Sequence, residues 1–265
     1  MTQAQRGTAF LVLHQGDPFV IANAWDAGSA RVLAGMGFKA LATTSSGFAY
    51  TLGRHDGGPG LDEVIEHTTT LAAATELPLS VDLENGHGPA PEDAANAITR
   101  AADAGAVGGS IEDYDPDEDI VYGRERAAER VTAAVEAARA TGFDFTLTAR
   151  AENHIRGNPD LDDTIARLQA YEAAGADVLY APGLRTVEEI RAVREATSRP
   201  LNVLARPKLT MGEIAAAGGT RVSLGGSLAF VAAAAMIGVA ERIRDDGDFS
   251  EIAVKLPPEF GDWLD

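Results

Sequence analysis

Two acidic residues in the segment Ser80-Val-Asp-Leu-Glu-Asn carry the clearest chemical signal in this sequence. Asp82 and Glu84 end a short apolar run, and alternate residues of a strand face the same side, so both carboxylates can face one site. Glu112 ends a second apolar run and can join them. Clustered carboxylates repel one another unless a cation neutralises them, and oxygen ligands suit Mg²⁺ or Mn²⁺. The alternative is that Glu84 is solvated and Asp82 caps a turn.

Other polar side chains follow further apolar runs. Arg150 ends one of them, and its planar fork suits a substrate carboxylate, although an ion pair with Glu112 or Glu152 would equally explain it. The run Ser45-Ser-Gly offers hydroxyls and backbone N–H groups to an oxyanion, or else caps a helix. Asn202 is expected to be buried, so it needs a partner in the substrate or the backbone.

Several catalytic chemistries are excluded or disfavoured. The chain has no cysteine, which excludes thiolate ligands, a cysteine nucleophile and disulfides. Its lysines do not end apolar runs, so a Schiff-base aldolase is disfavoured. The histidines lack metalloprotease spacing; His87 and His154 could transfer protons, or simply lie on the surface. Gly225-Gly-Ser has no cation beside it, so close packing is favoured there over phosphate binding.

The candidate residues lie where short apolar runs end, and helical patterns separate these runs. The expected strands are Phe19–Ala22, Ala40–Thr43, Leu79–Leu83, Val107–Glu112, Phe145–Arg150, Val178–Ala181, Leu201–Leu204 and Arg221–Leu224. The expected helices are Thr2–Leu13, Ala27–Met36, Leu61–Thr75, Pro91–Ala104, Arg124–Thr141, Leu161–Ala174, Val187–Thr197, Thr210–Ala217 and a last one from about Ser227. Asp160 and Thr186 suit helix N-caps, and Gly105, Gly142 and Gly175 suit helix C-termini.

Eight strand–helix units in 265 residues predict one (β/α)8 TIM-barrel domain over residues 1–265, with its chemistry at the C-terminal ends of the strands. An open doubly wound sheet would need a glycine fingerprint after the first strand, and Asn23-Ala-Trp-Asp-Ala-Gly is not one. The segment from Pro257 to Asp265 is expected to be a C-terminal extension that packs on another part of the molecule.

Charge and hydropathy disfavour some classes of binding partner and of cellular location. The formal net charge is −18 with no basic block, which disfavours nucleic acid. No apolar stretch reaches the ~18 residues that a membrane span requires, and the N-terminus lacks a secretory pattern, so a cytoplasmic location is expected. An anionic substrate would need a locally positive pocket, supplied by a metal ion or a placed arginine.

Six segments together resemble the isocitrate lyase / phosphoenolpyruvate mutase superfamily over nearly the whole chain. They are Asn23-Ala-Trp-Asp-Ala-Gly-Ser-Ala, Ala42-Thr-Thr-Ser-Ser-Gly, Ser80-Val-Asp-Leu-Glu-Asn-Gly-His-Gly, Gly109-Ser-Ile-Glu-Asp, Thr148-Ala-Arg-Ala-Glu and Pro200-Leu-Asn-Val. The resemblance implies a (β/α)8 barrel whose last helix is exchanged with a neighbouring subunit in a homodimer or homotetramer. It also implies Mg²⁺ and 2-oxo or 2-hydroxy acid substrates that pass through an enolate.

The resemblance also implies roles for individual residues, each at the position that matches the superfamily pattern. Asp82 resembles the direct metal ligand, at the place where substrate also binds, while Asp56, Glu84 and Glu112 resemble ligands that act through bound water. The substrate carboxylate and oxo group would be held by Thr44, Ser45, Ser46 and Gly47. Trp25 resembles a wall of the pocket, and Arg150 and Asn202 resemble substrate contacts, with Arg150 also stabilising the enolate.

The sequence departs from the superfamily pattern where an acid/base is expected. Lyases of the superfamily carry Lys-Lys-Cys-Gly-His or a close variant after the fourth strand, whereas the segment from Tyr114 to Gly123 has no Cys, Lys or His. The Lys and Asn that the mutases place there are missing as well, and Tyr180 stands where mutases have a His. Tyr180, His154 and Glu112 therefore remain alternative acid/base candidates.

These features predict a Mg²⁺-dependent carbon–carbon lyase or decarboxylase, such as an oxaloacetate decarboxylase-like enzyme. Its substrate would be a small 2-oxo or 2-hydroxy di- or tricarboxylic acid. One alternative is a phosphonopyruvate hydrolase or a phosphoenolpyruvate mutase-like enzyme acting on a C–P bond. Others are a non-catalytic 2-oxo acid-binding protein and a phosphate-binding barrel of another kind.

Overall fold

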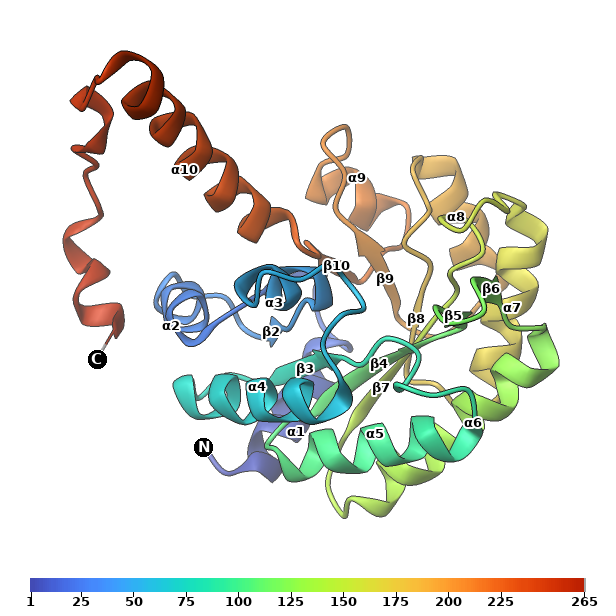
Figure 1. Ribbon diagram of the computed structural model, residues 1–265. Helices are drawn as coiled ribbons and strands as arrows, with labels where there is room; N and C mark the ends of the chain where they lie inside the picture. The colour runs from blue at the N-terminus through green and yellow to red at the C-terminus, as the bar shows by residue number, and fades with distance from the viewer. Residues whose placement is uncertain (265) are drawn as a thin grey trace.

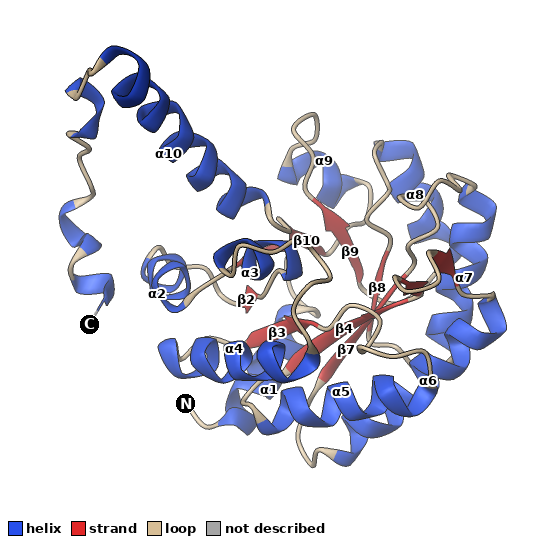
Figure 2. Ribbon diagram, in the orientation of Figure 1, coloured by secondary structure: helices blue, strands red, loops and turns tan. Residues whose placement is uncertain are grey.

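The chain forms a closed barrel of eight parallel strands, and Figures 1 and 2 show it among its helices. The computed structural model describes residues 1–264. The barrel strands are β1 (Phe19–Asn23), β2 (Leu41–Ala42), β3 (Leu79–Asp82), β4 (Gly108–Glu112), β7 (Thr146–Arg150), β8 (Val178–Tyr180), β9 (Leu201–Leu204) and β10 (Arg221–Ser223). Each pairs in parallel with its neighbours, and β10 closes on β1. The predicted (β/α)8 fold is confirmed.

The predicted helices surround the barrel, except for the last one, which extends away from it (Figure 2). They are α1 (Gln3–Leu13), α2 (Ala27–Gly35), α4 (Leu61–Ala74), α5 (Pro91–Asp103), α6 (Arg124–Ala140), α7 (Leu161–Ala173), α8 (Val187–Ala196), α9 (Met211–Ala216) and α10 (Ser227–Asp246). The predicted N-caps are confirmed, since Asp160 accepts from the N–H groups of Asp162 and Asp163, and Thr186 from that of Glu189. Gly105, Gly142 and Gly175 follow helices with φ of 101°, 79° and 99°, a conformation that glycine adopts without strain.

Two local structures do not follow from the apolar pattern. A short helix, α3 (Ser45–Thr51), starts directly after β2, and a hairpin of β5 (Tyr114–Asp115) and β6 (Ile120–Val121) forms after β4. The tail adds three 3₁₀ turns, η1 (Ser250–Ile252), η2 (Pro258–Phe260) and η3 (Asp262–Leu264). Elements of two to seven residues are too short to show a hydrophobic period, so only tertiary contacts define them.

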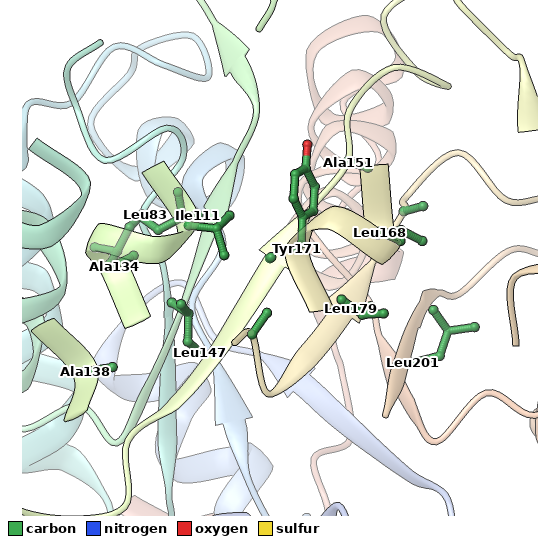
Figure 3. Close-up of a cluster of buried hydrophobic side chains, with 14 of the residues drawn as sticks. Leu83, Ile111, Ala134, Ala138, Leu147, Ala151, Leu168, Tyr171, Leu179 and Leu201 are labelled. Carbon is green, nitrogen blue, oxygen red and sulfur yellow. The ribbon is translucent and has the colours of Figure 1, made fainter. Parts of the chain in front are cut away.

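The main apolar core lies between the strands and the helices, and Figure 3 shows part of it. Leu147, Leu179 and Leu201 point outward from their strands into this layer, against Leu168 of α7 and its neighbours. Tyr171 rises from the same layer, and its hydroxyl donates to Asp113. The barrel interior is polar by contrast, because Ser80, Ser110 and Ser223 alternate with the outward apolar residues and line a cavity inside it.

Helix α10 projects away from the barrel, and the red tail runs back toward α2 (Figure 1). Apolar side chains of α10 are therefore largely exposed, among them Phe230, Val231, Met236 and Ile237. The tail ends against α2, where Trp263 packs on Gly35 and Arg31 donates to the carbonyl of Leu264. Within residues 1–264, no helix is long and apolar enough to cross a membrane.

Candidate active site

Asp82 lies at the centre of the candidate site, at the C-terminal end of β3. Its Oδ2 accepts from the backbone N–H of Ser45 at 3.4 Å, and its Oδ1 accepts from the hydroxyl of Ser110 at 3.4 Å. Its own N–H donates to the hydroxyl of Thr43 at 2.8 Å. One Arg150 nitrogen lies 3.8 Å from Asp82 Oδ1. Three neighbouring strands, a helix start and a guanidinium thus meet at this carboxylate.

Glu84 stands in a strained loop directly beyond β3. Its φ is +50° and that of His87 is +59°, a region that costs non-glycine residues about 1–2 kcal/mol each and is typical of functional loops. Burial, with the nearby charges of Asp82 and Asp56, raises the pKa of Glu84 to about 8. Asp56 itself lies in the exposed loop before α4. The structure therefore brings Asp56 within electrostatic reach of Glu84, as the metal-site hypothesis requires.

Glu112 and Arg150 end the adjacent strands β4 and β7 and are paired in register. An Arg150 nitrogen lies 3.2 Å from Glu112 Oε2, and its Nε donates to Glu152, whose side chain is fully buried. Burial raises the pKa of Glu112 well above its usual value, although Arg150 opposes this shift. Arg150 thus makes both of the ion pairs that the sequence left open.

The side chains around Asp82 include more carboxylates than guanidiniums. Asp82, Glu84, Glu112 and Glu152 face two guanidiniums, those of Arg150 and Arg156. No three His, Asp or Glu side chains between residues 1 and 264 converge as a complete direct metal site. A cation held directly by Asp82, with the other acids reached through water, fits this spread, and an all-oxygen donor set suits Mg²⁺ or Mn²⁺. Burial and, after it, the nearby negative charges of this cluster raise the pKa of Glu84.

Helix α3 points its N-terminus at Asp82. Thr44 is its N-cap, and the Thr44 hydroxyl accepts from the N–H of Gly47 at 3.4 Å and contacts the Ser46 hydroxyl at 3.2 Å. A Cβ at Gly47 would lie 2.6 Å from Thr44 Cγ2 and 3.1 Å from Trp25 Cβ, so only glycine fits. Ser45, Ser46 and Gly47 form the first turn of this helix, as the capping interpretation predicts, and the N–H of Ser45 lies beside Asp82. Such a terminus attracts an anion.

A cavity of about 70 Å³ runs from this mouth into the barrel. Tyr180 lines it, with its ring 5.5 Å from the Arg150 guanidinium, and burial raises the pKa of the Tyr180 phenol. Asn202 lines it too and donates to Ser223 Oγ at 3.0 Å. The buried Asn202 amide therefore has a side-chain partner before any substrate binds.

The predicted site residues His154 and Trp25 contact other parts of the molecule. The His154 ring bonds to Thr164 Oγ1 at 3.0 Å, and its carbon atoms would be 2.1 Å from a Cβ at Gly183, so it packs between the barrel and α7. Trp25 lines a separate groove with Phe48 and His67, and its carbonyl accepts from His67 Nε2 at 3.0 Å. Its Cβ lies close to Gly47 at the start of α3.

Several polar residues of the cavity were not predicted from the sequence. Ser80 and Ser110 line the cavity and lie two positions before Asp82 and Glu112, respectively. Thr148 lies two positions before Arg150 and contacts the cavity residue Arg221. A polar residue two places before each strand-end candidate was the signal available. Arg221 and Ser223 show the same spacing on β10.

The hairpin after β4 is held beside the mouth by side chains. Arg156 stacks on the Tyr114 ring at 3.6 Å and donates to Glu152 Oε2 at 3.2 Å. At the base of the hairpin, the Tyr122 hydroxyl donates to Asp115 Oδ2 at 3.0 Å, and the Tyr122 carbonyl accepts from Arg167 at 2.8 Å. The segment that lacks the expected Cys, Lys and His therefore has a defined structure of its own.

Comparison with known proteins places the chain in a family context. The sequence pattern of the family described as phosphoenolpyruvate phosphomutase matches residues 10–244. A solved structure from Burkholderia cenocepacia, provisionally described as a lyase or mutase, is 48% identical, with a TM-score of 0.95 over 99% of this chain and 96% of that one. A phosphonopyruvate hydrolase solved with oxalate and Mg²⁺ is 28% identical, with a TM-score of 0.84 over 97% and 92% of the two chains. An oxaloacetate decarboxylase from Rhodopseudomonas palustris is 30% identical over 71% of this chain and 65% of that protein.

Proposed function

Because this chain belongs to the phosphoenolpyruvate phosphomutase family, we propose that it is a Mg²⁺-dependent lyase or decarboxylase. Its reaction would break a carbon–carbon bond of a small 2-oxo or 2-hydroxy di- or tricarboxylic acid through an enolate. The observation that carries this proposal is that Asp82, the N-terminus of α3 and Arg150 meet at one cavity mouth. A carboxylate that can bind a cation therefore lies beside two hydrogen-bond donors, the N-terminus of α3 and Arg150, that can bind an anion.

The proposed Mg²⁺ site consists of Asp82 as direct ligand, with Glu84, Glu112 and Asp56 acting through water. A divalent cation there would supply positive charge to the oxo oxygen on which negative charge develops. It would also relieve the repulsion from Asp82 and Asp56 that adds to burial in raising the pKa of Glu84. Asp82 is pre-positioned for this role, because Ser110 and the backbone of Ser45 already orient its two oxygens.

The substrate would be oriented by donors of this chain. The N–H groups of Ser45, Ser46 and Gly47 lie at a helix N-terminus, where a carboxylate is favourably bound. Arg150 offers a guanidinium whose direction is set by Glu112 and Glu152. Such donors, fixed before the reaction, can stabilise developing negative charge without reorganising.

The choice between decarboxylation and larger C–C cleavages depends on an acid/base. Loss of CO₂ from a 2-oxo diacid needs no base, whereas cleavage of a 2-hydroxy acid needs one to take the hydroxyl proton. Tyr180, which lines the cavity, and Glu112, which pairs with the cavity residue Arg150, remain the candidates, since the ring of His154 is turned to Thr164. A raised pKa keeps the Tyr180 phenol protonated, so Tyr180 suits the donor that would protonate the enolate rather than the base.

A C–P bond reaction is the second candidate function. The phosphonopyruvate hydrolase among the similar structures, solved with oxalate and Mg²⁺, supports it. Release of inorganic phosphate from phosphonopyruvate would select it over C–C cleavage. A ligand-stabilised protein that turns over none of these acids would instead be a 2-oxo acid-binding protein.

The test is a turnover panel with Mg²⁺ that covers oxaloacetate, phosphonopyruvate and alkyl-substituted malates and citrates, read by release of pyruvate, glyoxylate or phosphate. Asp82→Asn should abolish Mg²⁺-dependent turnover while leaving the fold intact. The matched control is Asp62→Asn on α4, whose carboxylate is exposed and pairs only with Arg100. Undiminished activity of the Asp82 variant would refute the metal assignment, and so the proposed mechanism.

We further propose that α10 is exchanged between subunits of a homodimer or homotetramer. Its exposed Phe230, Val231, Met236 and Ile237 would then be covered by a second copy, as apolar patches of this kind usually are. Light scattering after gel filtration measures the assembly, and a monomer at micromolar concentration would contradict this proposal.

A further inference from the structure

The cavity below the mouth ends at a buried guanidinium, that of Arg221. This residue starts β10, and it is only 4% exposed. Its Nε donates to Asn202 Oδ1 at 2.8 Å, and its terminal nitrogens contact Thr148 Oγ1 at 2.9 Å and His14 Nε2 at 3.2 Å. All three partners are uncharged, and burying a charge with no opposite charge beside it costs several kcal/mol.

The two arginines of the cavity differ in this respect. Arg150 is neutralised by Glu112 and Glu152, whereas no carboxylate in residues 1–264 lies within ion-pair distance of Arg221. Burial lowers the pKa of Arg221 to about 10, so the side chain stays protonated at neutral pH. The cavity therefore holds a permanent positive charge that the protein itself does not balance.

His14 closes the far side of this guanidinium. Burial, with the charge of Arg221, lowers the pKa of His14 to about 3, so its imidazole is neutral. Its Nδ1 lies 2.8 Å from the Phe10 carbonyl and must donate to it, which leaves the Nε2 lone pair to accept from Arg221. An anion can approach Arg221 only from the cavity side.

We propose that Arg221 forms a subsite for a second carboxylate of the substrate, so that the enzyme acts on a short dicarboxylic acid. The inference rests on the proposed function for placing the reacting end of the substrate at Asp82. The span between the two ends is short. Arg221 donates to Thr148, the strand neighbour of Thr148 is Ser110, and Ser110 donates to Asp82. The remaining walls include Ser80 and Ser223, which offer hydroxyls to a polar ligand.

The charge of Arg221 also discriminates between reaction types. A carboxylate that departs as CO₂ loses its charge in the transition state, so a cation on it stabilises the bound substrate more than the transition state. A carboxylate that the product retains keeps its interaction with Arg221 throughout. The subsite therefore favours a diacid whose second carboxylate survives the reaction.

Calorimetry in the presence of Mg²⁺ tests the subsite with two ligands. Oxalate is short enough to occupy the mouth alone, whereas malate carries a second carboxylate that can reach the interior. Arg221→Met should weaken malate binding about 10- to 100-fold and leave oxalate binding within about twofold. An equal loss for both ligands, or an unchanged malate affinity, would overturn the proposal.

Two further variants control for structural damage. His14→Gln keeps a neutral acceptor for Arg221 and should retain both affinities, because only the side remote from the cavity is changed. If Arg221→Met does not fold, Arg221→Lys decides instead, since it keeps the charge but not the fork. A loss confined to malate then supports the subsite, and an equal loss for both ligands, or no loss for either, rejects it.

The subsite and the proposed function can fail separately. Arg221-dependent malate binding by a protein without any turnover would keep the subsite and reject the proposed function. If Arg221→Met turns over diacids in the presence of Mg²⁺ with the same kcat and KM as the unchanged protein, the subsite is rejected and the proposed function is kept.

Discussion

Asp113 accepts a hydrogen bond from the backbone N–H of Glu152 at 2.7 Å, and so joins β4 to β7 just beyond the Glu112–Arg150 pair. The other oxygen of Asp113 accepts from Arg167 at 3.0 Å and from the Tyr171 hydroxyl. The carboxylate is thus fully used by the protein. Its role is to hold the strand ends that carry the site, and it is not free to bind a ligand.

Asp113→Ala should therefore destabilise the fold strongly. The change leaves Arg167 buried beside the hairpin without its inner carboxylate, and breaking a buried pair costs about 3–5 kcal/mol. Urea unfolding measures the loss. Asp163→Asn is the matched control, because it removes only the more exposed partner of Arg167, at 2.9 Å, and should cost about 1 kcal/mol or less. Equal losses in the two variants would contradict this account.

Gly47→Ala should impair the site more than the fold. A Cβ at 2.6 Å from Thr44 Cγ2 and 3.1 Å from Trp25 Cβ forces the first turn of α3 to move, at a cost of about 1–3 kcal/mol. Because the Ser45 N–H on that turn contacts Asp82, turnover and oxalate binding should fall together. Gly212→Ala on α9, where nothing lies within 4 Å of the new methyl group, should change neither. Unaltered kinetics of Gly47→Ala would show that α3 does not position the ligand.

His14 should make stability depend on pH. Its folded-state pKa of about 3 lies below the unfolded value of 6.5, so the unfolded chain binds more protons as the pH falls through 6.5. The contribution of His14 is complete above pH 6.5, is lost progressively below it, and levels off near pH 3. Between pH 7 and pH 5 the loss should be about 2 kcal/mol.

The comparison of His14→Gln with the unchanged protein isolates this contribution, because other groups titrate in both. The variant should lose less stability between the two pH values, measured as urea midpoints at constant salt. Parallel pH profiles for the two proteins would mean that His14 is protonated in the folded state.

Mg²⁺ should stabilise the folded chain through Asp82. A ligand that binds only the folded state adds about 2.7 kcal/mol at a free concentration of 100 times its dissociation constant. The melting temperature should rise on adding Mg²⁺ and fall back with a chelator, and Asp82→Asn should abolish both changes. Asp62→Asn should preserve them. A shift that survives in the Asp82 variant would place the cation elsewhere.

Much of the barrel was predictable, because its strands and helices each have the length and hydrophobic period that local sequence can show. Leu161–Ala173, for example, begins at the Asp160 cap and ends before Gly175. The acids and Arg150 were identified for the same reason, since a strand that ends at the barrel mouth delivers its last polar residue there. The resemblance then supplied the metal and substrate class that periodicity alone could not.

The partners of each side chain were decided by tertiary structure. Arg150 was ambiguous between a substrate and an ion pair, and its contacts with both Glu112 and Glu152 depend on the register of β4 against β7. The predicted proton-transfer residue His154 is turned to Thr164, which no local pattern indicates. The hairpin from Tyr114 to Val121 depends on long-range contacts such as Arg156 with Tyr114.

By itself, then, the sequence determined the order of strands and helices and which residues end the strands, because backbone propensity and hydrophobic period are local properties. Only the closed barrel decided that Arg221 and His14, which are 207 residues apart, would meet inside it, and that no acid among residues 1–264 would pair with Arg221. Burial and electrostatic pairing are properties of the assembled interior, and no single segment of the chain contains them.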